Sequence, residues 1–353
     1  MAAEVPFRRS PWTGAAGQGE LDRWLKVAEG VAAEVAPGAL RRDRDNALPV
    51  AEVGVLRESG LLNLLIPAIA GGEGGHFKTA FHVVRTVARA DPSLGTILGY
   101  HYLNQACVTF YGADERRQLE WYRASAAGRW AWSDSFNPVS PDLALAHDGS
   151  GYRLSGTKRF ATGAAVADIV ITGAVAAGGP YDGQLLVIAL PHDRAGIEYL
   201  SDWDNLGYRA SASGSVRYAD VAVAEADMIG ADSGEPFSSV VTPGVQLLFG
   251  NIYLAIAQAA LEHARKLTLA RPNAWFLSSA DRYADDPVVH RVVGELVART
   301  VAVEALADRL NDRFDEAVAL AGETTAADRA ALEISVAQLK VVATEVSPVS
   351  LYT

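Results

Sequence analysis

The spacing of apolar residues predicts helices in the first third of the chain. Within residues 20–36 the apolar side chains recur at helical spacing and form one stripe, which consists of Leu21, Trp24, Leu25, Ala28 and Val31. Pro37 and Gly38 follow, and they predict the end of this helix. Further helices are predicted from about residues 49, 78 and 92. The last of these is apolar on nearly every face, so we expect it to be buried.

The pattern changes at about residue 128. Short runs rich in Val, Ile, Trp, Tyr and Thr alternate with Gly, Pro, Asp and Asn, which is typical of strands joined by turns. From about residue 237 long helical stripes return, and Asp286 and Pro287 are residue types expected at a helix start. The sequence therefore predicts an α+β fold with an N-terminal α-helical domain (1–127), a central, mostly antiparallel β domain (128–235) and a C-terminal α-helical domain (236–353).

Composition and charge exclude several kinds of partner. The formal net charge is −11, whereas a nucleic-acid surface needs clustered Lys and Arg, so we expect no nucleic-acid partner. The single cysteine, Cys107, permits neither a disulfide nor a thiolate metal site within one chain, and its apolar neighbours predict a small buried residue. No apolar run approaches the roughly 18–20 residues of a membrane span. Arg8 and Arg9 are not followed by the apolar stretch of an export signal, so we expect no membrane partner and a cytoplasmic location.

Several motifs, together with the order helix, sheet, helix, resemble those of the acyl-CoA dehydrogenase superfamily. The stretch GYRLSGTKRFATGA (151–164) is quite specific to this superfamily. DWDNLGYRAS (202–211) and RPNAW (271–275) are similar to stretches of its reduced-flavin-dependent monooxygenase branch, which includes dibenzothiophene monooxygenases and amino-sugar N-oxygenases. ADPSLGTILGYHYLNQ (90–105) and GNIYLAIAQAALEHAR (250–265) add to the resemblance, which extends from about residue 50 to about residue 340.

The resemblance implies a flavin ring beside the turn at residues 158–163. Thr162 matches a residue whose hydroxyl lies near the flavin N5 atom, and Phe160 and Ala161 stand beside it. The alternative is that Thr162 is an ordinary threonine of the β domain. Lys158 is expected to be a solvated charge on a strand.

At the end of the preceding strand, the resemblance implies that Ser133, Asp134 and Asn137 bind the pyrimidine edge of the flavin. Asp134 departs from the related dibenzothiophene enzyme, which is expected to have Asn at this position. A carboxylate there would oppose the negative charge of the reduced ring. The role of Asp134 is therefore open.

Two aromatic residues match active-site positions of the monooxygenase branch. Tyr100 lies on the helix expected to be buried, where its hydroxyl would reach the flavin or the substrate. Trp203 would form a wall of a dry cavity near the flavin. For both residues the alternative is ordinary packing, with a satisfied hydroxyl in the case of Tyr100. His101, beside Tyr100, is expected to be a core histidine.

Arg271 is the candidate for binding the cofactor phosphate, because the matching arginine of the superfamily reaches a phosphate, often across a subunit boundary. Ser278 would add a hydroxyl donor. This implies a homo-oligomer, either a dimer or a tetramer. The alternative is a surface arginine. The sequence contains no GxGxxG or P-loop motif, so a Rossmann-type NAD enzyme is excluded.

The residues of the helix expected after about residue 237 favour an oxygenase over an acyl-CoA dehydrogenase. Dehydrogenation needs a carboxylate to remove the α-proton, and residues 237–261 contain no Asp or Glu. Oxygen transfer from a flavin hydroperoxide to sulfur or another heteroatom needs no such base, and it needs a cavity without water, which Phe249 and Tyr253 would line. The resemblance implies reduced FMN from a separate NADH-dependent reductase, O2 and a small apolar substrate. An FAD-dependent acyl-CoA dehydrogenase is the alternative enzyme, and no metal is expected.

The resemblance fades near Thr344, whereas members of the family continue through another helical stretch with cofactor contacts. We therefore expect an incomplete C-terminal bundle, weakened flavin binding and low activity. An inactive oligomeric remnant is the alternative from a different class of protein.

Overall fold

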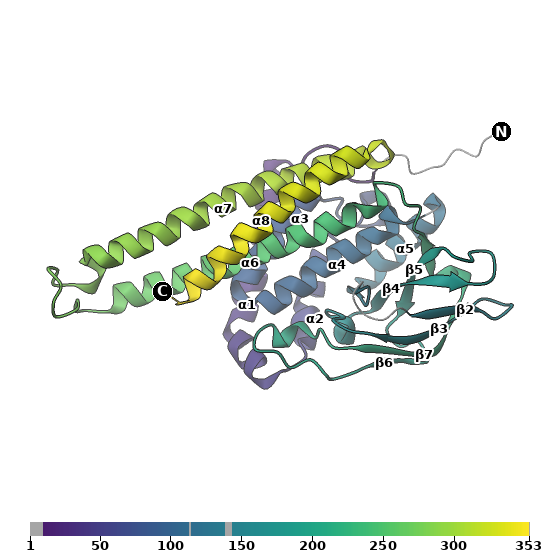
Figure 1. Ribbon diagram of the computed structural model, residues 1–353, viewed down its shortest axis with the longest axis horizontal. Coiled ribbons are helices and arrows are strands. Elements are labelled where there is room, and N and C mark those ends of the chain that lie inside the picture. Colours follow the sequence, from purple (N-terminus) through teal and green to yellow (C-terminus); the bar gives the residue numbers. More distant parts are fainter. Residues whose placement is uncertain (1–9, 113, 138–142, 353) are drawn as a thin grey trace.

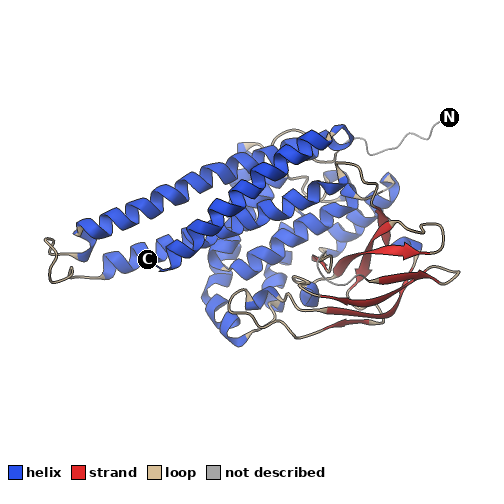
Figure 2. Cartoon of the chain, in the orientation of Figure 1, coloured by secondary structure: helices blue, strands red, loops and turns tan. Residues whose placement is uncertain are grey.

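The computed structural model describes residues 10–112, 114–137 and 143–352, with side chains up to residue 346. The N-terminal part is a group of packed helices (Figures 1 and 2). They are α1 (Gln18–Asp45), α2 (Val50–Glu58), α3 (Phe77–Ala90), α4 (Pro92–Phe110) and α5 (Glu115–Gly128). The Asp91 carboxylate caps α4 by accepting from the N–H of Leu94 at 3.1 Å. α4 is buried along nearly its whole length, as its apolar sequence predicts.

The middle of the chain forms one curled sheet beside these helices (Figure 2). Its strands are β1 (Trp132–Asp134), β2 (Ala144–His147), β3 (Tyr152–Lys158), β4 (Ile169–Ala177), β5 (Leu185–Pro191), β6 (Ile197–Tyr199), β7 (Val216–Val223) and β8 (Met228–Ala231). The strand order is β6-β7-β3-β2-β4-β5-β8, and β1 pairs with β4. β4 pairs in parallel with β1 and β2, and the other pairs are antiparallel. The predicted, mostly antiparallel sheet is confirmed.

The C-terminal part returns to helices, which are α6 (Val241–Ala270), α7 (Pro287–Leu320) and α8 (Ala326–Tyr352). The Asp286 carboxylate accepts from the N–H of Val288 at 2.8 Å, and Pro287 occupies the first turn of α7, as predicted. α6 and α7 extend beyond the rest of the protein, and the loop between them lies at their free end (Figure 1). The observed order of helices, sheet and helices confirms the predicted architecture.

Helix α1 does not end at Pro37, contrary to the prediction. Pro37 lies inside the helix with its side chain exposed. Just over one turn later, the buried guanidinium of Arg42 donates to the carbonyl of Val35 at 2.8 Å. The same guanidinium pairs with Asp91 and Glu52, each at 2.8 Å. These bonds hold the backbone on both sides of the proline, so the loss of one helical hydrogen bond is tolerated.

Helix α6 departs from the expectation that no segment has the length and composition of a membrane span. The helical segment Ser238–Ala270 has 33 residues, and its most apolar window has a mean hydropathy of 1.6. However, 61% of that window is buried inside the protein, where α3, α4 and α8 pack around the helix. The apolar sequence of α6 is therefore explained by its position in the core of the bundle.

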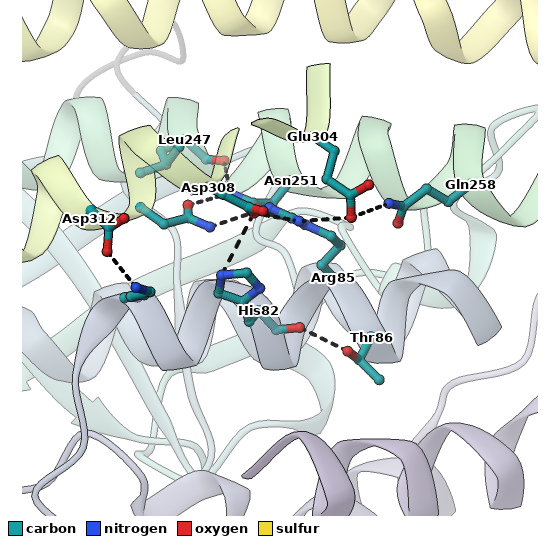
Figure 3. Close-up of polar contacts among 11 residues, drawn as sticks. His82, Arg85, Thr86, Leu247, Asn251, Gln258, Glu304, Asp308 and Asp312 are labelled. Atoms are coloured by element: carbon teal, nitrogen blue, oxygen red, sulfur yellow. Dashed lines mark hydrogen bonds and ion pairs between the residues drawn. The ribbon is translucent and has the colours of Figure 1, made fainter. Parts of the chain in front are cut away.

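A buried polar cluster joins α3, α6 and α7 (Figure 3). The Arg85 guanidinium donates twice to Asn251 Oδ1, at 2.7 and 3.1 Å, and pairs with Asp308 at 2.7 Å. The Asn251 amide also donates to Asn311 Oδ1 at 2.9 Å. Both asparagines are fully buried, so a shifted alignment of the helices would leave amides unpaired at a cost of about 1–3 kcal/mol each. The cluster therefore fixes α6 relative to its neighbours.

Helices α4 and α6 approach each other closely at Gly99. A Cβ atom at this position would lie only 2.0 Å from Leu248 Cδ1. Leu248 is completely buried, so its side chain has little room to move away. Tyr100 and Phe249, the next residues along each helix, meet edge to face with ring centroids 6.1 Å apart. The missing side chain at residue 99 thus sets the distance between the two helices.

We expect Gly99→Ala to lower the free energy of unfolding by about 1–3 kcal/mol, because the added methyl overpacks the contact with Leu248. The matched control is Gly30→Ala in α1, where a Cβ atom would meet nothing within 4 Å. That change should raise the free energy of unfolding by up to about 1 kcal/mol through helix propensity. Urea unfolding measures both, and a neutral or stabilising Gly99→Ala would contradict this account of the helix contact.

Candidate active site

A cavity of about 480 Å³ lies between α4, α6 and the sheet. Five of the residues predicted for the site line it, namely Tyr100, Asp134, Asn137, Phe160 and Phe249, whereas Tyr253, which was also predicted to line it, does not. Three separate parts of the chain therefore meet here: the buried helix, the end of β1 and the turn after β3. Val241, Val245 and Phe249 of α6 add apolar surface.

One face of α4 forms the long wall of the cavity. Tyr100, Asn104, Cys107 and Tyr111 line it, and their positions differ by four, three and four residues, which is the spacing of one helical face. Burial holds the pKa of Tyr100 well above its usual range, so its hydroxyl stays protonated and can donate. Of these four residues only Tyr100 was predicted from the sequence to be a site residue. The helical spacing from Tyr100 was the signal that would have identified Asn104 and Tyr111.

Phe160 forms the outer part of the cavity. Its backbone has a φ of 62°, in the left-handed region, and its side chain is 57% exposed. This strained turn presents the ring at the cavity rather than in the core. The Trp203 ring packs edge to face against the Phe160 ring, with centroids 6.0 Å apart. The Trp203 indole N–H donates to the carbonyl of Tyr208 at 2.8 Å, which fixes its orientation. Trp203 lines a smaller neighbouring cavity and not the main one.

Thr162 and Ala161 lie in the same turn, and both are buried. The N–H of Ala161 donates to the carbonyl of Gly214 at 3.0 Å. The Thr162 hydroxyl is 3.0 Å from the hydroxyl of Ser213, which in turn is 2.7 Å from that of Ser211. This chain of hydroxyls joins the turn to the segment before β7 and holds Phe160 in place.

Lys158 is buried, contrary to the expectation of a solvated charge. Its ammonium group donates to the backbone carbonyl of Asn137 at 3.1 Å. The Asn137 amide donates to the carbonyl of Arg159 at 3.3 Å. Lys158 points inward at the end of β3, and the segment after β1 covers it. These bonds join the two segments that the sequence analysis assigned to the flavin.

His101 connects α4 to β1. Its Nδ1 accepts from the N–H of Trp132 at 3.1 Å, and its Nε2 lies 2.9 Å from the carbonyl of Leu62. Burial lowers the pKa of His101 to about 4, so the ring is neutral and can accept on one nitrogen and donate on the other. The expectation of a core histidine agrees with this environment, and the contact sets the position of β1 against α4.

Asp134 follows Trp132 by two residues and carries the only carboxyl group lining the cavity among the described residues. No described residue donates a hydrogen bond to it or pairs with it. Burial raises the pKa of Asp134 to about 7. The neighbouring Ser133 is buried, and its hydroxyl oxygen also has no partner in the described part of the chain. Ser133 does not line the cavity. The end of β1 therefore carries two polar side chains that no described residue satisfies.

Arg271 and Ser278 do not join the cavity within one chain. Both lie in the loop between α6 and α7, at the free end of the helical pair and away from the sheet (Figure 1). The Arg271 guanidinium lies over the ring of Tyr283, 4.3 Å from its centroid, and is exposed. The Ser278 hydroxyl accepts from the N–H of Ala280 at 3.1 Å. A contact with a phosphate at the cavity would need a second subunit.

Comparison with known proteins agrees with the fold and the cavity. Residues 25–129 match the family "Acyl-CoA dehydrogenase, N-terminal domain", and residues 135–221 match "Acyl-CoA dehydrogenase, middle domain". A probable FMNH2-dependent monooxygenase of Pseudomonas putida is 35% identical over 90% of this chain and 80% of its own length. The dibenzothiophene monooxygenase of Rhodococcus erythropolis is 33% identical over 91% of this chain and 80% of its own.

Two solved structures are similar along most of their length. The methanesulfinate monooxygenase of Pseudomonas fluorescens has a TM-score of 0.86 and 32% identity, and the match covers 93% of this chain and 88% of that one. The FMN-bound form of a Paenibacillus dibenzothiophene monooxygenase has the same TM-score and identity, with 92% and 84% covered.

The chain therefore belongs to the acyl-CoA dehydrogenase superfamily. Within that superfamily it is an FMNH2-dependent monooxygenase, because the relatives that cover most of its length belong to that group.

The raised pKa of Asp134 predicts that wild-type protein loses stability with rising pH compared with Asp134→Asn. In the unfolded chain this carboxyl titrates near pH 4, so between about pH 4 and pH 7 the folded state binds the additional proton. The unfolding free energy of wild type minus that of Asp134→Asn should fall by about 2 kcal/mol between pH 5 and pH 8. Urea unfolding at both pH values measures this, with exposed Asp281→Asn as the control for a lost charge. If the difference in unfolding free energy between the two proteins did not change with pH, the pKa of Asp134 would not be raised by folding and the prediction would be wrong.

Proposed function

We propose that this monooxygenase uses reduced FMN and O2 to transfer one oxygen atom to sulfur, or to another heteroatom, of a small apolar substrate. The observation that carries the proposal is the cavity in which Tyr100, Asp134, Asn137 and Phe160 meet. Relatives that act on dibenzothiophene and on methanesulfinate support sulfur as the oxidised atom.

The residues of the cavity fit a flat ring with a polar edge. The exposed ring of Phe160 supplies an apolar face, and Asn137 supplies a polar group just after β1. Ser133, Asn137, Phe160 and the turn at Ala161 and Thr162 would hold the flavin. The bound reduced flavin supplies the electrons that activate O2.

The protein's own contribution is to exclude water and to place a proton donor. The faces of α4 and α6 are mostly apolar at the cavity, which keeps water from the reacting atoms. The Tyr100 hydroxyl remains protonated at neutral pH and can donate a hydrogen bond to an oxygen atom of the reacting molecules. α6 contributes no carboxylate to the cavity, so the base required for dehydrogenation of an acyl-CoA is not present on this helix.

We expect purified protein to convert dibenzothiophene to its sulfoxide when FMN, NADH and a separate flavin reductase are added. Isotopically heavy O2 should label the product, and mass spectrometry measures the label. Tyr100→Phe should lower kcat about 10²-fold, because a positioned proton donor is lost. Tyr181→Phe, in the loop between β4 and β5, is the matched control. Unlabelled sulfoxide, or oxygenation that is absent for every sulfide, sulfoxide and amine tested, would overturn the proposal.

We further propose that the enzyme acts as a homo-oligomer in the cytoplasm, where an NADH-dependent reductase supplies its flavin. The loop carrying Arg271 projects from the molecule, with Trp275, Phe276 and Leu277 more than half exposed. Apolar surface of this kind at a loop tip is typical of a contact between proteins. Contact with a second subunit would bring the Arg271 guanidinium to the FMN phosphate.

If Arg271 binds the phosphate, Arg271→Ala should weaken the binding of FMN about tenfold, since one charge-assisted contact is lost. Riboflavin lacks the phosphate and serves as the control ligand, so its dissociation constant should not change. Fluorescence titration measures both ligands. Equal weakening of FMN and riboflavin would show that the loop acts on folding or assembly and not on the phosphate.

A further inference from the structure

Two complementary polar groups face the cavity and have no partner among the described residues. The side-chain nitrogen of Asn104, a donor, is buried and makes no hydrogen bond with this part of the chain. The carboxyl group of Asp134, an acceptor, has no donor among the described residues. Both residues line the same cavity, one from α4 and the other from the end of β1.

The two groups belong to the wall of one cavity, and no hydrogen bond joins them. Asn104 lies on the α4 face between Tyr100 and Cys107. Burial raises the pKa of both of these residues, and the nearby charge of Asp134 raises it further. The Asp134 carboxyl therefore faces this part of α4. The Asn104 nitrogen has no hydrogen bond to any described atom, so it stays available to a molecule in the cavity.

The lining of the cavity is mostly apolar. Ile171 and Val187 of the sheet, together with Val241 and Val245 of α6, line the same cavity. Leaving a buried donor or acceptor unsatisfied destabilises a protein, whereas a ligand that pairs with both groups removes that cost. Such a ligand must carry a donor beside an acceptor on an otherwise apolar body.

We propose that Asp134 and Asn104 select the substrate, and that the preferred substrates are neutral, mostly apolar heteroatom compounds that carry an N–H or O–H beside a carbonyl-type oxygen. The N–H or O–H donates to Asp134, and the oxygen accepts from Asn104. This inference rests on the proposed function, because it takes the cavity to be the place of oxygen transfer. The Asp134 carboxylate disfavours anionic substrates such as sulfinates.

The pyrimidine edge of the flavin has the same pattern of donor and acceptor, and the resemblance implies that it contacts the end of β1, where Asp134 lies, but it implies no flavin contact for Asn104. Phe160 and Asn137 line the cavity near the turn assigned to the flavin. Asn104, by contrast, is followed along the α4 face by Cys107 and Tyr111, which lead away from Tyr100. We therefore take the two groups together as a contact for the substrate, and the effect of their substitution on FMN binding separates this role from a flavin contact.

Three bicyclic probes of similar shape test the pairing. Benzothiophene offers neither group, indole offers an N–H, and oxindole offers an N–H beside a carbonyl. Calorimetric titration with saturating oxidised FMN, and without a reductant, measures binding in the absence of turnover. For the wild type we expect the dissociation constant to fall about tenfold from benzothiophene to indole, and again from indole to oxindole.

Two variants separate the two roles. Asn104→Leu should abolish the advantage of oxindole over indole and keep that of indole over benzothiophene. Asp134→Leu should abolish the advantage of indole over benzothiophene. Cys107→Ala, on the same wall, is the matched control and should change all three affinities by the same factor.

Equal affinities for the three probes, or no binding of any probe up to its solubility limit, would overturn the proposal. If Asp134→Leu instead weakened FMN and preserved the order of the probes, the pair would belong to the flavin and the proposal would be wrong. A preserved probe order together with no oxygenation of any substrate would refute the proposed oxygen transfer and leave the binding role of the pair supported.

Discussion

The contact between α4 and α6 at Gly99 is the constraint on which the site depends. Because residue 99 has no side chain, the buried Leu248 of α6 packs directly against the backbone of α4. The next residues, Tyr100 and Phe249, then meet at the edge of the cavity. The polar cluster around Arg85 and Asn251 holds α6 in register, and the His101 ring holds β1 against α4. The cavity lies between α4, α6 and β1, and these contacts fix the positions of the three elements.

This arrangement explains why the cavity keeps unpaired polar groups. A protein core normally pairs each buried donor and acceptor, and exceptions are expected where a ligand completes the pairing. Among the described residues the side-chain nitrogen of Asn104 and the carboxyl of Asp134 are two such groups that line the cavity, and other unpaired atoms lie elsewhere in the protein. In the proposed function a bound molecule would pair these groups, and the protein without it is less stable because they stay unpaired.

Much of this architecture could be predicted from the sequence. Hydrophobic periodicity gave the order of helices, sheet and helices, and family motifs gave Tyr100 and Phe160, which meet at the cavity. The division at residues 127/128 and 235/236 stays a prediction. Predictions from local sequence patterns were wrong where contacts between residues far apart in the sequence determine the structure. Arg42 sustains α1 beyond Pro37 through Asp91, and the segment after β1 buries Lys158. Asn104 was not predicted, although it lies one helical turn from Tyr100, because the sequence does not show whether the amide of a buried asparagine has a hydrogen-bond partner.

The central claim is that the flavin ring lies in the cavity between Phe160 and the Tyr100 face of α4. A crystal structure of the protein with FMN bound tests it most directly. The account predicts density for the isoalloxazine ring in this cavity, in contact with Phe160 and with the end of β1 at Ser133. Fully occupied FMN at another place, with the cavity closed by side chains, would contradict it.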